Sequence, residues 1–412
     1  MDIQFVRQKQ RITLSMIITV IVILVNSGYY RTIVTDSYLP LGLLIIFSIY
    51  FLLSKSKKNN KYPSKKTYLG LLLAGILFSI LFNFTVQNVL SGGRVAATLI
   101  CGFILVYNLD IDKFIRTLSG CIRVIIVLSL FFFLLESYVG TFNLPRIGDY
   151  YDLCFVTARA NATRAHGVFW EPGVFSSVIL MTLILNIYLT DRKTKARHIF
   201  LYVLGVLMTK STAGYLILFV LLIGFLWKKG GLNKRRGFDI LFTLCIGLLA
   251  IFYEDIFLWL STINPTVFSK LIEIDTNTLA TRLNGPLINL TIFFQKPLFG
   301  WGFTNAATQF SNYISMSGYR NIVAQTSTST QILSSIGFLG LAYTIAFFSP
   351  LFHKSTVSDL YFVDKVIIAF CMLLIVNKEP HLYSVITWML MFYLIQKPSR
   401  AVATDNCDRL AN

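Results

Sequence analysis

Long apolar runs separated by short basic clusters restrict the fold of this chain more than any other feature. Of its 412 residues, 55% are hydrophobic and only 14% are charged, which is more apolar surface than a core surrounded by water can bury. Twelve runs are candidates to cross the roughly 30 Å of hydrocarbon in a bilayer. They cover residues 12–27, 38–54, 68–89, 95–109, 121–139, 172–190, 198–209, 213–228, 238–253, 329–352, 361–377 and 381–396. The sequence therefore predicts an all-α polytopic membrane protein with one integral membrane domain, residues 1–412, and argues against a soluble enzyme.

The basic residues orient these spans. The net charge is +18, and most lysines and arginines fall on one side of a bundle of about 12 transmembrane helices whose termini are both cytoplasmic. This distribution follows the positive-inside rule, so it indicates membrane topology and not nucleic-acid binding. The opposite side then carries two large extracytoplasmic loops, residues 140–171 and 254–328. A loop as long as the second usually has a function.

The segment from His198 to Lys228 is too short for two full crossings. Its residues reach only about 46 Å as a helix, yet basic clusters flank both of its ends. We therefore expect a short hairpin whose tip, Thr209 to Gly214, stops below the outer membrane surface. Lys210 is costly there unless it faces a cavity or an anion, and Ser211 adds a hydroxyl donor. The alternative is a snorkelling lysine on a tight turn.

Glu171 stands directly before Pro172, at the first turn of the predicted helix 172–190. This position places a carboxylate at the positive end of a helix dipole. Arg164 and His166 lie just upstream. Two plainer interpretations stay open, namely an ordinary helix start with interfacial aromatic residues and a structural ion pair between Arg164 and Glu171.

Three more charged residues lie on the predicted outer side: Arg94 between the third and fourth spans, Arg282 in the second loop and Glu379 in the last outer turn. Alone, each has a structural explanation, such as an interface marker or a solvated loop residue. Together the outer cations exceed the carboxylates. Several arginines converging at a membrane surface suit a phosphate or diphosphate, because guanidinium binds oxyanions bidentately. No Walker-type loop or His/Cys cluster is present, so neither a metal nor a cofactor is indicated.

Four motifs in this order resemble those of the Wzy-type polysaccharide polymerases and their relatives, the O-antigen ligases. They are Arg164-x-x-Gly167-x-Phe169-x-Glu171-Pro172, the Ser/Thr-rich run Thr209–Tyr215, Arg282 followed by Lys296–Gly302, and Ser327–Thr330 leading into Gly337–Gly340. The resemblance covers most of the chain. Ligases of this family tend to carry a histidine near the end of the long loop, where this chain has Ala324-Gln325-Thr326. This departure favours a polymerase and leaves the general base unassigned.

The resemblance implies a GT-C-like fold and a glycosyltransferase of the bacterial cytoplasmic (inner) membrane, acting in O-antigen, lipopolysaccharide or capsule biosynthesis. The donor would be an undecaprenyl-pyrophosphate-linked oligosaccharide, and the acceptor would be another lipid-linked repeat unit. Membrane lipid, a chain-length regulator and a flippase are the implied partners. The alternatives are an O-antigen ligase and a lipid-linked oligosaccharide flippase or transporter.

The candidate site follows from the same motifs. Arg164 and Arg282 are expected to hold the pyrophosphate, and Glu171 is expected to orient or deprotonate the acceptor hydroxyl. The expected substrate-binding residues are Lys210, Ser211, Arg94, His166 and Glu379.

Overall fold

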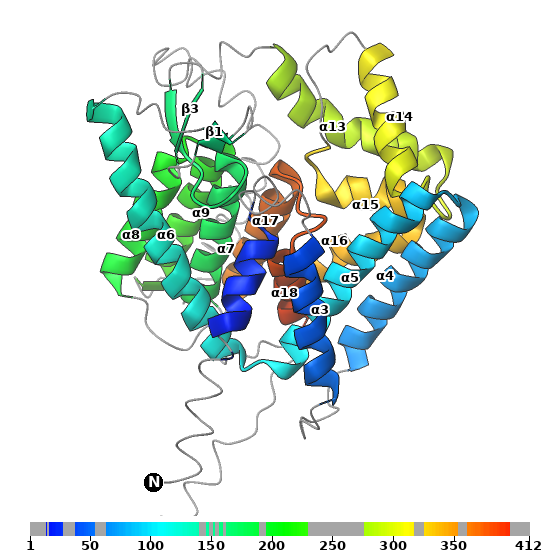
Figure 1. The fold of residues 1–412 in the computed structure, drawn as a ribbon, viewed down its shortest axis with the longest axis horizontal. Helices are drawn as coiled ribbons and strands as arrows, with labels where there is room; N and C mark the ends of the chain where they lie inside the picture. The colour runs from blue at the N-terminus through cyan, green and yellow to red at the C-terminus, as the bar shows by residue number, and fades with distance from the viewer. Residues whose placement is uncertain are drawn as a thin grey trace, which may run out of the picture.

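The computed structural model shows a bundle of helices (Figure 1). The residues it describes are 14, 16–27, 38–53, 63–139, 146–147, 151–152, 156–159, 162–188, 195–229, 276–316, 325–352 and 361–395. The predicted span 238–253, both chain ends and the first part of the predicted loop 254–328 lie outside the described residues.

The described helices range from nine residues in α15 to 29 residues in α6. The helices are Met16–Val25, α3 (Tyr38–Leu53), α4 (Pro63–Phe82), α5 (Val86–Asn108), α6 (Ile111–Val139), α7 (Pro172–Tyr188), α8 (Ala196–Met208), α9 (Thr212–Lys229), α13 (Thr276–Gln295), α14 (Phe303–Met316), α15 (Thr328–Ile336), α16 (Leu341–Phe352), α17 (Phe362–Lys378) and α18 (Val385–Leu394). Helices α5 and α18 show how closely two helices of the bundle can pack. A β-carbon on Gly102 would lie only 2.8 Å from that of Trp388.

Within the described residues, three helical stretches are long and apolar enough to cross a membrane, judged by length and composition: Val86–Asn108, Asp112–Glu136 and Thr328–Phe352. Shorter apolar helices accompany them. These stretches confirm the expectation of a helical membrane protein at this coarse level. The third stretch is broken, because a 3-10 turn at Gly337–Gly340 separates α15 from α16.

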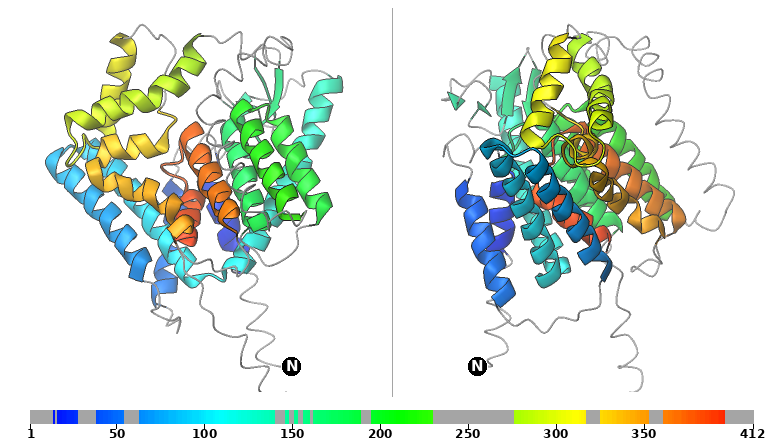
Figure 2. Two further views of the ribbon diagram at one scale, coloured as in Figure 1. Left: turned by 180° about the vertical axis from the view of Figure 1, so that it is seen from behind. Right: turned by 90° about the vertical axis from the view of Figure 1, so that its right-hand side faces the viewer.

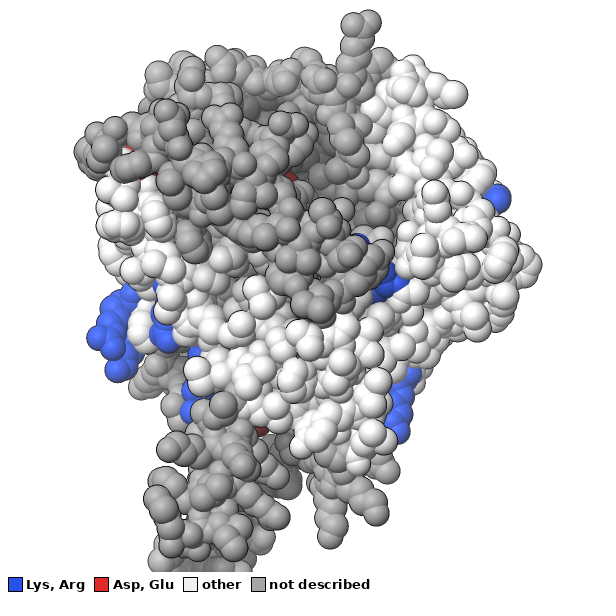
Figure 3. Space-filling model, in the orientation of Figure 1, with Lys and Arg blue, Asp and Glu red and all other residues white. Residues whose placement is uncertain are grey.

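The two ends of the bundle differ in what they carry. The short strands and the helices α13 and α14, which belong to the two predicted outer loops, lie at the same end (Figures 1 and 2). Helices α6 and α8 begin at the other end, with Lys113, Arg116, Lys195 and Arg197 near their starts. The described surface in Figure 3 is mostly uncharged, and blue Lys and Arg atoms gather towards its lower left and lower right.

The predicted loop 140–171 contains two strand pairs that the sequence analysis did not predict. Strand β1 (Arg146–Ile147) pairs antiparallel with β2 (Tyr151–Asp152), and β3 (Val156–Arg159) pairs antiparallel with β4 (Ala162–Ala165). Strands of two to four residues are too short to show an alternating pattern. The bundle is all-α as expected, and small β-structure covers one end of it.

The predicted boundary between the third and fourth spans is wrong, because it placed Arg94 outside both helices. The chain turns at 83–85 instead, Thr85 caps α5, and the helix continues through Arg94. A pair of glycines, Gly92 and Gly93, precedes Arg94 within α5. A β-carbon on Gly92 would lie 2.8 Å from Ile80 Cδ1, so this glycine serves the close approach of α4 and α5.

Candidate functional site

Arg164 holds the tip of the α8–α9 hairpin, the tip being Thr209–Ser211. Strand β4 carries Arg164, whose Nε donates to the Thr209 carbonyl at 3.1 Å and whose Nη2 donates to the Lys210 carbonyl at 3.3 Å. These carbonyls end helix α8, where the helix dipole is negative and a cation is stabilised. The structure thus brings together Arg164 and Lys210, which lie in separate motifs of the sequence.

Lys210 adopts a left-handed backbone conformation with φ +48°, which costs a residue with a β-carbon about 1–2 kcal/mol. The turn needs this conformation because only two residues, besides Lys210 itself, join α8 to α9. The Lys210 ammonium lies 5.7 Å from the centre of the Phe133 ring. Helix α6 continues past Phe133 to Val139, about 9 Å further. The hairpin is therefore present as predicted, and its tip stops short of the end of α6.

Lys378, the last residue of α17, fastens the tip to α7. Its Nζ donates to Ser176 Oγ on α7 and, at 3.5 Å, to Ser211 Oγ on the tip. All three side chains are buried. Ser211 Oγ also accepts from Gly214 N at 3.3 Å, so the predicted substrate-binding hydroxyl caps α9. A buried ammonium requires such hydroxyl partners, because burying it without hydrogen bonds would be prohibitive.

Two carboxylates flank the start of α7. Glu171 is half-buried, and its carbonyl accepts from Phe175 N at 3.1 Å in the first helical turn. Glu379 is only 2% exposed and lies directly against Gly173, where a β-carbon would be 1.9 Å from Oε1. The positive end of a helix stabilises negative charge at both positions. Glu171 is the carboxylate nearer to solvent, and Glu379 belongs to the buried layer below it.

A buried hydrogen-bond network continues from Glu379 to α15. Thr328 Oγ1 donates to the Glu379 carbonyl at 3.3 Å and accepts from His381 N at 2.8 Å. Asn377 Oδ1 accepts from Ser327 Oγ at 3.0 Å and from Ser329 N at 3.1 Å. These bonds fix the turn between α17 and α18 against the first residues of α15. The Ser327–Thr330 motif therefore meets the predicted Glu379 turn.

The network reaches α13, the helix that carries Arg282. Asn289 Nδ2 donates to Thr330 Oγ1 at 3.1 Å, and Asn289 Oδ1 accepts from Gln325 Nε2 at 2.9 Å. Arg282 lies seven residues before Asn289 in this helix. The Arg282 side chain lies outside the described part of the chain.

Arg94 and His166 occupy the edges of this cluster. The Arg94 guanidinium lies over the Tyr383 ring, 4.7 Å from its centre, and Tyr383 belongs to the same turn as Glu379. His166 is buried, and its Nδ1 bonds the Phe169 carbonyl at 2.9 Å. Because a carbonyl only accepts, Nδ1 must be the protonated nitrogen. His166 thus closes the turn that leads from β4 to Glu171.

The Gly300–Gly302 segment packs against the break between α15 and α16. Trp301 N donates to the Ser334 carbonyl at 2.9 Å, and Gly302 N donates to the Ser335 carbonyl at 3.0 Å. In sequence, this motif resembles an element of the polymerase family. Here its N–H groups satisfy the last carbonyls of a buried helix, which would otherwise lack partners.

Lys378, Ser176 and Asn377 are the site residues that sequence reasoning missed. A usable signal existed for Lys378. It ends an apolar run as Lys210 does, so the same membrane-cost argument applies to it. Ser176 and Asn377 gave no signal, because isolated polar residues in apolar helices are common and only their partners distinguish them.

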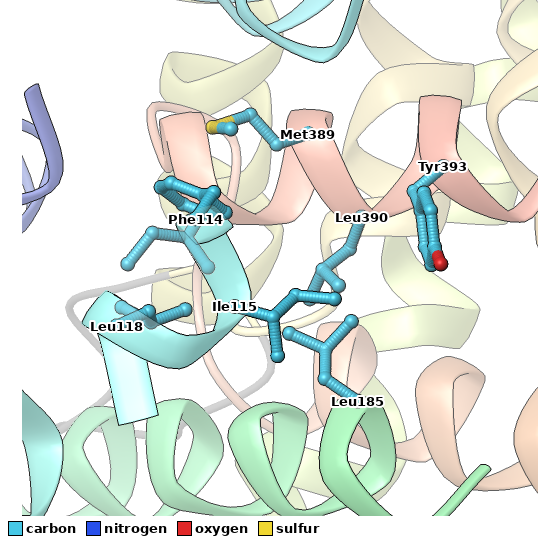
Figure 4. A pocket seen from close by; sticks show the side chains of 8 residues that line it. Phe114, Ile115, Leu118, Leu185, Met389, Leu390 and Tyr393 are labelled. Carbon is cyan, nitrogen blue, oxygen red and sulfur yellow. The ribbon is translucent and has the colours of Figure 1, made fainter. Parts of the chain in front are cut away.

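A small apolar pocket lies at the other end of the bundle, between α6, α7 and α18 (Figure 4). It is lined by Phe114, Ile115, Leu118, Leu185, Ile386, Met389, Leu390 and Tyr393. This pocket offers no cation to an anionic ligand, so it is no part of the candidate site.

Among the residues that the structure describes, no three His, Cys, Asp or Glu side chains are grouped as metal ligands would be. The chain matches no protein-family model and no curated protein. The resemblance to the polysaccharide polymerases therefore stays a prediction from the four motifs.

Proposed function

We propose that the protein is a polysaccharide polymerase of the bacterial cytoplasmic membrane, with about twelve spans, both termini in the cytoplasm and its site on the outer side. One observation carries the proposal most strongly. Cations from three separate segments meet at the hairpin tip: Arg164 on β4 and Lys378 on α17 both bond the tip that carries Lys210, and Lys378 also bonds Ser176 near the start of α7. Such a cluster at the end of an apolar bundle suits a diphosphate on a lipid carrier.

The reaction is the transfer of a glycan from a polyprenyl diphosphate to a sugar hydroxyl. The acceptor oxygen forms a bond to the anomeric carbon of the donor, and the bond from that carbon to the diphosphate oxygen breaks. The diphosphate leaves with the electron pair, and the acceptor proton passes to a base. Fixed cations stabilise the charge that develops on the leaving group.

These tasks divide among the candidate residues. Lys210 and Arg164, with Arg282 from α13, bind the diphosphate. Glu171 accepts the proton, because it is the half-buried carboxylate at the start of α7. Lys378 and Glu379 are buried and position the hairpin tip and α7. Arg94 contacts the Tyr383 ring and thereby positions the turn that carries Glu379.

Deletion of the gene, followed by complementation, tests the proposal. The surface glycan is run on a gel for wild type and for the variants Glu171→Gln, Arg164→Lys and Lys210→Gly, each checked for normal insertion. A ladder that collapses to a single repeat unit in the deletion supports a polymerase. Loss of lipid-linked repeat units from the outer face instead supports a flippase, and intact polymer that is not attached to its final acceptor supports a ligase.

A further inference from the structure

Helix α13 presents an unusually apolar outer face for a segment of a predicted aqueous loop. Leu287, Phe294 and Leu298, in the helix and the turn after it, are 61%, 72% and 64% exposed. On the opposite side of α13, Asn289, Ile292 and Phe293 are buried. Large apolar side chains thus lie on the outward side of α13 as well as on its buried side, whereas a helix in water has a polar outward side.

This face continues into the lipid-facing surface of the bundle. Phe299 stacks on Phe82 of α4, with ring centres 4.0 Å apart, and lies 5.8 Å from Phe78 one turn below. Both α4 rings are exposed. In the break between α15 and α16, Phe338 is exposed and lies 5.2 Å from Phe293. Aromatic contacts therefore join α4 to the turn after α13, and join α13 to the break between α15 and α16.

The polar groups on the α13 face are satisfied internally or placed at its edge. Thr291, between Leu287 and Phe294, donates its hydroxyl to the Leu287 carbonyl at 3.0 Å, as required of a hydroxyl that faces hydrocarbon. Lys296 lies at the end of the helix, with its ammonium 4.0 Å from the centre of the Trp301 ring. A lysine and a tryptophan at one edge are typical of a membrane–water interface.

Helix α14 provides the contrast. It follows α13 by a turn of seven residues, yet its exposed residues are mainly small or polar. They are Ala307, Thr308, Ser311, Asn312, Ser315 and, at the helix end, Met316. The change from apolar to polar outer faces occurs between the two helices, so the bilayer surface passes between them.

We infer that α13 is seated in the membrane interface, with Leu287, Phe294 and Leu298 in the acyl-chain region and α14 in water. The occupant of the apolar face is the bilayer itself. A second copy of the chain is not required, because the face is continuous with the lipid-facing side of α4. The inference goes beyond the proposed function and holds for any activity of the protein.

Spin labels in liposomes of phosphatidylethanolamine and phosphatidylglycerol test this placement. Single cysteines replace Leu287, Phe294, Thr308 or Asn312 in a full-length chain whose other cysteines are alanine. If that chain does not fold, Cys101 and Cys371 are kept, because they are buried and unreactive. Labels on α13 should be relaxed several-fold more by oxygen than by a water-soluble nickel chelate, and labels on α14 should show the reverse.

Two results would overturn the inference. Equal relaxation by the nickel chelate at Phe294 and Asn312 would place α13 in water. Protection of the α13 labels from both reagents would mean that a protein surface, such as a second copy, covers the face. Neither result depends on glycan transfer, so the outcome is independent of the proposed function.

Discussion

The Glu379 carboxylate fills the space that a side chain on Gly173 would need, since a β-carbon there would lie 1.9 Å from Oε1 and 2.6 Å from Cδ. The end of α17 and the start of α7 are thereby held in direct contact. Lys378 bonds Ser176 on the same turn of α7, so the last residue of α17 and the residue after it together fix the start of α7. This junction supports Glu171, which is half-buried and directly precedes α7.

Gly173→Ala tests the junction. The methyl group should displace Glu379 and shift the start of α7, and a shift of about 1 Å at a catalytic group can cost 10- to 100-fold in rate. The measurement is the initial rate of polymer formation by purified protein. Gly93→Ala is the matched control, because a β-carbon at Gly93 meets nothing within 4 Å. Equal activity of the two variants would contradict the proposed role of the junction.

Lys210→Gly separates the charge of Lys210 from its backbone conformation. Glycine adopts φ +48° without strain. The variant should therefore keep the conformation of the hairpin tip, and its melting temperature should be no lower than that of wild type. The lost charge should lower activity about 10- to 100-fold, the equivalent of one charge-assisted hydrogen bond. Lys210→Arg keeps the charge and should retain most activity. A fully active Lys210→Gly protein would remove Lys210 from the site.

Lys378→Met removes the ammonium that joins α17 to Ser176 and Ser211. Two buried hydroxyls lose a partner, which should destabilise the junction by about 1–3 kcal/mol. Hydrogen–deuterium exchange should become faster in residues 207–215, the hairpin tip and its flanks. Lys378→Arg should restore protection. Unchanged exchange in the Met variant would show that Lys378 does not position the tip.

Gly337→Ala tests the break between α15 and α16. Gly337 has φ +72°, and a β-carbon would lie 2.3 Å from the Leu298 carbonyl oxygen. Backbone atoms cannot move aside cheaply, so the variant should lose about 2–3 kcal/mol of stability. A lower melting temperature in detergent is the readout. Gly93→Ala is again the control, and should melt at or above the wild-type temperature because alanine favours helix. A wild-type melting temperature for Gly337→Ala would refute the packing described here.

Much of the helix pattern was predictable, because an apolar run long enough to cross a membrane can adopt few structures there other than a helix. The α8–α9 hairpin is the clearest case, since the length between two basic clusters required it. The boundary near Arg94 was mispredicted for a physical reason. Gly92 and Gly93 look like a helix break in sequence, whereas here Gly92 allows α4 and α5 to approach closely.

The short strands around Arg164 were not predictable, because their pairing involves too few residues to leave a pattern. The composition of the site was only partly predictable. Arg164, Lys210 and Glu379 stand out as charges at helix ends. Lys378 was overlooked because its importance depends on Ser176 and Ser211, two hydroxyls more than 160 residues away along the chain.

The sequence alone determined that this chain is a helical membrane protein, because its hydropathy and charge pattern act residue by residue and need no knowledge of neighbours. Only the tertiary structure decided which polar residues meet. Contacts such as Glu379 with Gly173, Arg164 with the hairpin tip, and the outward apolar face of α13 depend on helix packing over long separations, and no local pattern encodes them.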